Sequence, residues 1–184
     1  MQKIAQTRKI SIDERLFERI CLGDSDAFRE LYEQTYKPLY AFLLSYTQNR
    51  EDAKDLLQDT FLQILRNCCQ YQEQGNPMAW MMKIAKNLFL SHCRKSKAVT
   101  VNYEDLEHEI GFDEMGNVNN RLMLEKMFAL LSVEDRNIII LHDVGGLKHK
   151  EIAALMELPT GTVLARYHRG IRKLQKEFGE RRPI

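Results

Sequence analysis

Apolar and polar residues alternate along this chain with the period of a helix. Between Ala53 and Cys68 the apolar side chains return every three or four residues and form one stripe, and a polar side runs opposite. No segment shows the two-residue alternation of a strand, so the pattern predicts an all-α protein. The expected helices cover residues 13–22, 25–43, 51–69, 76–95, 121–131, 133–144, 148–157 and 160–178.

Several local signals mark where these helices begin and end. Gly23 is expected to stop the first helix, and Ser25 is expected to cap the second. Pro38 should kink that second helix, because its ring removes a backbone amide donor. Asn76 and Pro77 together favour a helix start, with Asn as the cap and Pro at the first helical position.

Composition narrows the class of protein. The chain has 184 residues, of which 44% are hydrophobic, enough for one medium or two small domains. No apolar run is long enough to span a membrane, and the first residues lack the apolar core of a secretory signal. The cysteines form no CxxC pair, so we expect four reduced thiols in a cytoplasmic protein: Cys21, Cys68, Cys69 and Cys93.

Charge divides the chain into three parts. The formal net charge is only +1, but residues 98–120 hold six acids and no Lys or Arg, whereas both flanking segments are mildly basic. That acidic stretch also has weak periodicity, so we expect a flexible acidic linker at 98–120 between small helical domains at 1–97 and 121–184. The stretch 74–102 holds no acid and five basic residues, and from Arg166 to Arg182 seven basic residues face two acids. Two such basic patches are typical of surfaces that meet a polyanion.

Residues 147–174 have the pattern of a helix-turn-helix. The first helix would bury Ile152 and Leu155, a turn would follow at 158–161, and the second helix would bury Val163 and Tyr167. In this motif the start of the second helix enters the major groove, and Arg there can bridge guanine O6 and N7. The predicted contacts with DNA are Thr162, Leu164, Ala165, Arg166, His168, Arg169, Arg172 and Lys173.

Two long segments resemble bacterial RNA polymerase sigma factors. LLSVEDRNIIILHDVGGLKHKEIAALMELPTGTVLARYHRGIRKL (130–174) resembles region 4, which reads the promoter's −35 element. AKDLLQDTFLQILR (53–66) and NPMAWMMKIAKNLFLSHCRK (76–95) resemble the polymerase-docking and −10 helices of region 2, and GDSDAFRELYEQTYKPLYAF (23–42) resembles its start. The layout, with two domains and no region 3, resembles the extracytoplasmic-function (ECF) subgroup of the sigma-70 family.

The resemblance implies a function and a set of site residues in the first domain. The chain would bind core RNA polymerase, direct initiation at specific promoters and help to melt the −10 DNA. Bases that leave the stack need aromatic platforms and basic grooves. The −10 contacts would be Tyr71, Trp80, Lys83, Ile84, Lys86, Asn87, Ser91, Arg94 and Lys95, and the polymerase contacts Asp52, Asp55, Leu56, Gln58 and Asp59.

Departures from the family pattern affect the promoter sequence more than the function class. Family members often carry Asp at the position of Ser91, and Lys-Ser at Leu164-Ala165. The resemblance also implies an anti-sigma partner, often membrane-bound. We expect no enzymatic activity, small-molecule substrate, cofactor or metal, because no nucleophile has an adjacent base and the histidines lack ligand spacing.

Two other function classes compete with this interpretation. An independent helix-turn-helix regulator with a helical sensor at 1–97 would dimerise and bind DNA alone. A helical adaptor without DNA function is the other, and the seven basic residues between Arg166 and Arg182 argue against it. Co-elution with core RNA polymerase would discriminate among the three.

Overall fold

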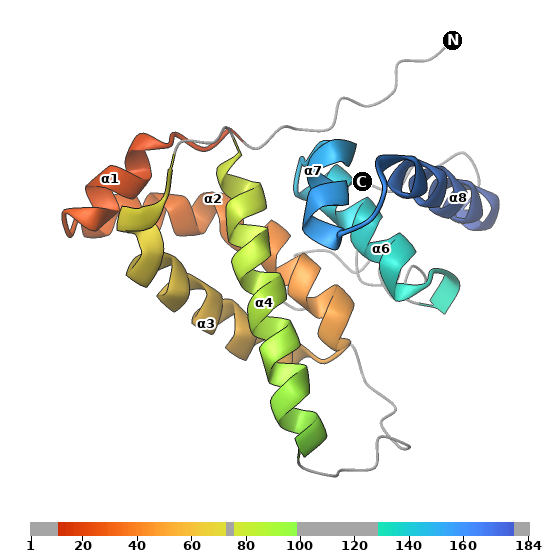
Figure 1. Ribbon diagram of the computed structural model, residues 1–184, viewed down its shortest axis with the longest axis horizontal. Coiled ribbons are helices and arrows are strands. Elements are labelled where there is room, and N and C mark those ends of the chain that lie inside the picture. The colour runs from red at the N-terminus through yellow and green to blue at the C-terminus, as the bar shows by residue number, and fades with distance from the viewer. Residues whose placement is uncertain (1–10, 73–75, 99–128, 179–184) are drawn as a thin grey trace.

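The computed structural model describes residues 11–72, 76–98 and 129–178. Every regular element in those residues is a helix, as the apolar periodicity predicts (Figure 1). Seven are α-helices within the described chain, and two short helical segments, η1 (3₁₀) and η3 (π), adjoin α3 and α6. The bounds are α1 Arg15–Cys21, α2 Ser25–Thr47, α3 Arg50–Asn67, η1 Cys68–Gln70, α4 Pro77–Ala98, α6 Val133–Ile139, η3 Ile140–Val144, α7 His149–Met156 and α8 Thr160–Phe178.

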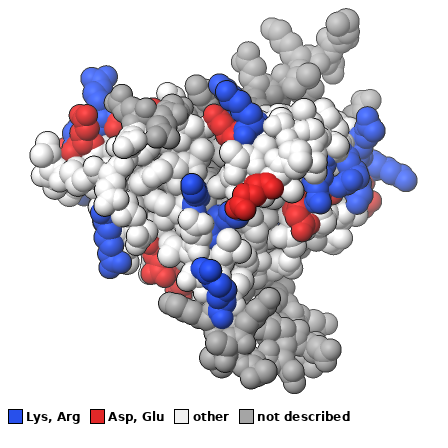
Figure 2. Space-filling model, viewed as in Figure 1, with Lys and Arg blue, Asp and Glu red and all other residues white. Residues whose placement is uncertain are grey.

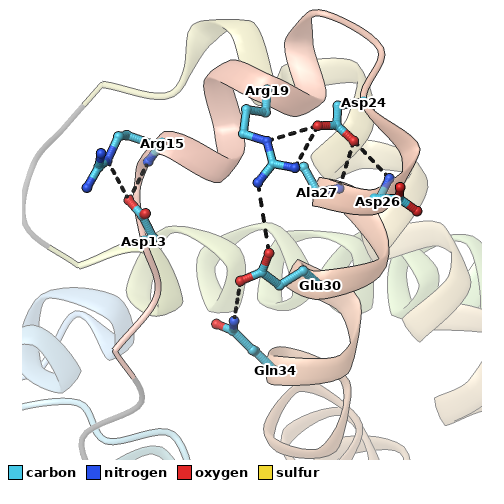
Figure 3. A network of polar contacts seen from close by, with 8 residues as sticks. All are labelled: Asp13, Arg15, Arg19, Asp24, Asp26, Ala27, Glu30 and Gln34. Atoms are coloured by element: carbon cyan, nitrogen blue, oxygen red, sulfur yellow. Dashed lines mark hydrogen bonds and ion pairs between the residues drawn. The ribbon is translucent and has the colours of Figure 1, made fainter.

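Side-chain caps explain where the long helices start. Asn76 accepts the Ala79 amide at the start of α4, as predicted. The expected cap at Ser25 is wrong, because the carboxylate of Asp24 accepts the amides of Asp26 and Ala27 instead (Figure 3). The Ala27 bond and the nearby Arg19 guanidinium hold the pKa of Asp24 below its usual value.

Pro38 lies inside α2 without ending it. The helix runs as one element from Ser25 to Thr47, with Pro38 on its buried side. The lost amide bond is tolerated because the second half of α2 is almost wholly buried, including Leu39, Phe42 and Leu43 at 0% exposure. Packing of that apolar surface outweighs the local preference against proline.

The N-terminal domain, residues 11–98, is built from α2, α3 and α4, which pack against one another pairwise. Its core contains Leu31, Phe42, Ile64 and Met81, all fully buried. α1 packs against α2 and η1 and closes one end of this bundle (Figure 1). The long exposed faces of α3 and α4 are left available for partners.

The C-terminal domain, residues 129–178, packs α6 and α7 against α8. α8 approaches α6 closely at Gly170, where an added Cβ would lie 2.8 Å from Ile139 Cδ1. The turn of the predicted helix-turn-helix spans 157–159, and Glu157 takes the left-handed conformation that ends α7 (φ 58°). Gly161, expected in the turn, is instead the second residue of α8.

The two domains pack together, in what we call the closed arrangement. α2 contacts α6 and η3, and α4 contacts α7. At the interface the Ser45 hydroxyl donates to Asn137, and an added Cβ on Gly145 would lie 3.4 Å from Met82 Cε. Burial, with the nearby Glu134 charge, raises the pKa of Tyr46 to about 12. The predicted linker and most of the helix expected at 121–131 lie outside the described residues.

Candidate nucleic-acid interface

The outer face of α8 carries the predicted −35 residues. Six of them are exposed, namely Leu164, Ala165, His168, Arg169, Arg172 and Lys173, and Thr162 and Arg166 are half-buried. Val163 and Leu174, on the opposite side, are fully buried in the domain core. Figure 2 shows the resulting cluster of basic side chains at the end of the molecule where α8 lies. Exposed Arg169, Arg172 and Lys173 therefore give this face of the helix a basic character.

Two of these arginines are held by a carboxylate of their own domain. Asp135, only 2% exposed, lies in the first turn of α6 and accepts from Arg169 at 2.9 Å and from Arg166 at 3.4 Å. The Ser132 hydroxyl caps the same helix by accepting the Asp135 amide. The helix dipole favours an acid in this first turn. Because Asp135 is buried and bonded to both arginines, it orients both guanidinium groups. The sequence pattern did not reveal this contact, which joins residues 31 and 34 positions apart.

The outer face of α4 carries the predicted −10 residues. Lys83, Asn87 and Arg94 are exposed, and Ile84 and Ser91 are half-buried beside them. Exposed Leu90 lies on the same face and was not among the predicted −10 contacts. The side chain of Lys95 lies outside the described residues. Because Asn87 is exposed, it is not a buried core amide.

Tyr71 and Trp80 form an aromatic cluster at the start of α4. The Tyr71 ring stacks on Phe17 at 4.2 Å between centroids, and Trp80 meets both rings edge-on at 5.2 and 5.5 Å. The Tyr71 hydroxyl donates to Glu14 at 3.0 Å. Trp80 is partly buried and packs against the hydrophobic core, so it also has a structural role. The cluster fixes Tyr71 directly after η1, where the segment that leads to α4 begins.

Lys86 is the exception among the basic residues of α4. Its ammonium donates to the Leu155 carbonyl at 2.7 Å and to Glu157 at 3.2 Å, both in the C-terminal domain. A second bond across the same junction joins the Asn76 amide to Glu151 at 2.7 Å. The side chain of Lys86 is only 14% exposed as a result. In the closed arrangement this cation is therefore engaged with α7.

The acidic strip of α3 is only partly as predicted. Asp55, Gln58 and Asp59 are exposed and lie on one face, and Asp52 is half-buried. Leu56, predicted to contact polymerase, is 4% exposed and belongs to the core, so a partner does not reach it in this structure. Two apolar residues extend the exposed strip instead, Leu62 at 49% and Leu65 at 37%. The helical period could have found Leu62, which falls outside the buried stripe.

A histidine cluster supports the fold of the C-terminal domain. The rings of His142 and His149 lie 4.3 Å apart, and both contact Tyr167 edge-on. Tyr167 donates to Asp143 at 3.0 Å, and burial raises the pKa of that carboxyl. Burial, and then the neighbouring His142 and His168, lower the pKa of His149. The cluster joins η3, α7 and α8 beneath the basic face of α8.

The cysteines differ from the sequence expectation. Cys21 and Cys69 form a disulfide with a Cα–Cα distance of 5.2 Å, so the prediction of four reduced thiols is wrong for this pair. Cys68 and Cys93 are free. The two bonded residues are 48 positions apart, and packing of α1 against η1 brings them together.

The comparisons with known proteins identify the family. Residues 31–99 match the family model of sigma-70 region 2, and residues 121–174 match that of sigma-70 region 4. The chain is 30% identical to the RNA polymerase sigma factor CarQ of Myxococcus xanthus over 166 residues, covering 89% of this chain and 95% of CarQ. It is 32% identical to the ECF sigma factor SigE of Mycolicibacterium smegmatis, covering 79% of this chain and 59% of SigE.

Solved structures agree with this assignment. The chain resembles the sigma factor RpoE in its complex with the anti-sigma factor NepR from Bartonella quintana, with 25% identity, a TM-score of 0.59 and coverage of 84% of this chain and 98% of that one. It has the fold of CnrH, solved with the cytosolic domain of CnrY (19% identity, TM-score 0.63, 92% and 99% covered). The chain belongs to the sigma-70 family, in its ECF group, whose members are initiation factors for promoter-specific transcription by RNA polymerase. No described helix has the length and apolarity required to cross a membrane.

Proposed function

We propose that this sigma factor docks on core RNA polymerase through α3 and reads the promoter at two separate surfaces. α8 reads the −35 element, and α4 with Tyr71 captures the −10 element. The observation that carries the proposal is the placement of two exposed basic helix faces on different domains, with the exposed acids Asp55 and Asp59 on a third helix. It acts in the bacterial cytoplasm, where polymerase and promoters are, and catalyses no reaction of its own.

Recognition of the −35 element rests on Arg166 and Arg169. Asp135 fixes both guanidinium groups, which reduces the entropy lost when either forms a bidentate contact with guanine. Thr162, Leu164 and Ala165 precede them on the first turns of α8, where a recognition helix meets base edges. His168, Arg172 and Lys173, further along, contact phosphates and set the register.

Capture of the −10 element rests on Asn87. Its amide is exposed and offers both a donor and an acceptor to the Watson–Crick edge of an extruded base. Ile84 and Ser91 border it on the same helix, and Lys83 and Arg94 supply charge for the strand's phosphates. Tyr71 and Trp80 form an aromatic wall at the N-terminal end of this face.

DNA binding and the closed arrangement compete. Lys86 must leave the Leu155 carbonyl and Glu157 before it can meet a phosphate. The free chain therefore binds promoter duplex weakly, and polymerase favours the DNA-binding form by engaging the two domains separately. This dependence on polymerase distinguishes a sigma factor from an independent helix-turn-helix regulator, which would bind its site alone.

An anti-sigma protein is the proposed regulator. The similar structure from Bartonella quintana contains the sigma factor RpoE bound to the anti-sigma factor NepR. In this chain the exposed Leu62 and Leu65 extend the acidic strip of α3 with apolar surface. A nearby hollow between α2 and α3 is lined by Tyr32, Tyr36 and Leu57, among others. A partner covering this face would block polymerase docking without touching DNA.

Co-elution with core polymerase and promoter melting test the two halves of the proposal. Asn87→Ala should retain polymerase affinity and lose permanganate reactivity of −10 thymines. His92→Ala is the matched control, because His92 is exposed on the same helix outside the proposed contacts. Normal opening by Asn87→Ala contradicts the base-capture role. Failure of the wild-type chain to bind core polymerase contradicts the whole proposal.

A further inference from the structure

Three cysteine sulfurs converge where α1 meets η1. Cys21 is the last residue of α1, and Cys68 and Cys69 are the first two residues of η1. Their sulfur atoms all lie within 4.8 Å of one another. Cys68 is buried, whereas Cys21 and Cys69 are exposed. Such a convergence of soft ligands needs an explanation beyond a single disulfide, because the third thiol takes no part in that bond.

The sulfur spacing is close to that of a thiolate metal site. Cys68 Sγ lies 3.9 Å from Cys69 Sγ. In a tetrahedral zinc site with Zn–S bonds of ~2.3 Å, two sulfurs are separated by roughly 3.8 Å. Reduction of the Cys21–Cys69 bond frees both of its sulfurs, and both side chains reach solvent, so they can separate to that spacing. Three thiolates would then surround one point, with the fourth position open to water.

We propose that Cys21, Cys68 and Cys69 bind one Zn²⁺ ion when the chain is reduced, and that the Cys21–Cys69 disulfide is the alternative state of the same site. Binding replaces three S–H bonds with three Zn–S bonds and releases three protons to solvent. Oxidation by a disulfide such as oxidised glutathione links Cys21 to Cys69 and yields two molecules of reduced glutathione. The two states exclude each other because they use the same two sulfurs.

The site lies next to the aromatic cluster of the candidate −10 surface. The Tyr71 amide donates to the Cys68 carbonyl at 3.1 Å, and Tyr71 stacks on Phe17 of α1. Metal and disulfide would each fasten α1 to η1, and so each would help to hold this stack. The metal-binding inference itself does not depend on the proposed promoter function.

Metal binding is measured on the full-length chain after reduction with a dithiol and removal of that reagent without oxygen. Zn²⁺ alone is titrated against a chromogenic chelator, with Cd²⁺ as a second probe for its sulfur charge-transfer absorption. We expect one metal ion per chain, release of three protons, and a fall in reactive thiols from four to one. The remaining thiol is Cys93, which lies on α4 outside the cluster. A folded, reduced chain that binds no stoichiometric metal overturns the proposal.

Single substitutions locate the ligands. Cys69→Ser, at an exposed position, should weaken Zn²⁺ binding at least 100-fold, and Cys21→Ser should do the same. Cys93→Ser should bind as the wild type does. Circular dichroism verifies that each variant is folded. Wild-type affinity in both Cys69→Ser and Cys21→Ser places the metal elsewhere and overturns the assignment.

The competition between metal and disulfide supplies a second test that needs no variant. Chain oxidised with glutathione disulfide should bind no Zn²⁺ and recover one site per chain after reduction, and bound Zn²⁺ should slow oxidation. Peptide mapping should find Cys21 linked to Cys69 in the oxidised chain. Equal Zn²⁺ binding by the oxidised and reduced chains contradicts the shared site.

Discussion

Replacement of Lys86 by Met tests whether the hydrogen bond between Lys86 and the Leu155 carbonyl stabilises the closed arrangement of the two domains. The Lys86 ammonium donates to the Leu155 carbonyl at 2.7 Å, near the C-terminal end of α7, and to Glu157 at 3.2 Å. Met retains an apolar stem of similar length and removes the ammonium group, with its charge and its hydrogen-bond donors. The substitution therefore isolates the polar contact with the C-terminal domain from the packing of α4.

The two bonds are worth different amounts. Glu157 is 84% exposed, so solvent screens its ion pair with Lys86, which contributes at most ~1 kcal/mol. The bond to the Leu155 carbonyl involves a charged donor that is only 14% exposed, and such bonds contribute about 1.5–3 kcal/mol. We therefore expect Lys86→Met to lower the free energy of unfolding by about 2 kcal/mol, most of it from the carbonyl bond.

Chemical denaturation followed by circular dichroism measures this loss. Lys83→Met is the matched control, because Lys83 is an exposed lysine on the same helix, and its effect should stay within about 0.5 kcal/mol. A double-mutant cycle with Glu157→Gln should give a coupling energy below ~1 kcal/mol. If Lys86→Met and Lys83→Met unfold at the same denaturant concentration, Lys86 does not hold the domains together and the reasoning fails.

Three further outcomes follow from other contacts. Arg169→Ala should weaken −35 discrimination by about 1–3 kcal/mol, because it removes a base contact. It should also lower the melting temperature, because buried Asp135 loses a hydrogen-bond partner. An unchanged −35 preference in a promoter library refutes the base contact. The double reversal of Asp55 and Asp59 to Lys should cut core polymerase affinity by orders of magnitude with little change in melting, and retained affinity moves the docking face elsewhere. The lowered pKa of His149 means that the folded chain binds fewer protons than the unfolded chain below about pH 6.5, so the free energy of unfolding should fall as the pH drops through that range. His149→Gln should flatten this pH dependence. If both proteins lose stability with the same slope against pH, His149 is not its cause.

Helical periodicity was sufficient for α3 and α8 because each buries one stripe of its surface. The prediction for α8 coincides with its observed bounds, Thr160–Phe178, and the start of α4 was correctly placed at Pro77. The errors are local and arise where two residues compete for one role. Asp24 caps α2 in place of Ser25, since a carboxylate one residue earlier already satisfies the same amides. The turn begins earlier than the predicted 158–161, because Glu157 takes the left-handed conformation that ends α7.

Contacts between distant segments could not be predicted in the same way. Nothing in the spacing of Cys21 and Cys69 indicates a bond, because the pair meets only after α1 docks on η1. The same holds for Lys86 and α7, which belong to different domains. Leu56 shows the reverse problem: a family motif assigned it to a partner surface, and its position in the stripe of α3 places it in the core. For Leu56 the family motif predicted a partner contact and the helical periodicity predicted a core position, and the observed burial agrees with the periodicity.

These long-range contacts change how promoter recognition should be understood under the proposed function. Lys86 is bonded to α7, and Arg166 and Arg169 are bonded to Asp135, so three of the proposed DNA contacts already have partners within the chain. Each contact with DNA must then replace or share an existing bond, and this cost offsets part of the entropy saved by holding Arg166 and Arg169 in place. A partner that separates the domains frees Lys86 without touching DNA, and so raises the chain's DNA affinity. Polymerase thereby contributes to promoter recognition through the arrangement of the two domains as well as through its own contacts with DNA.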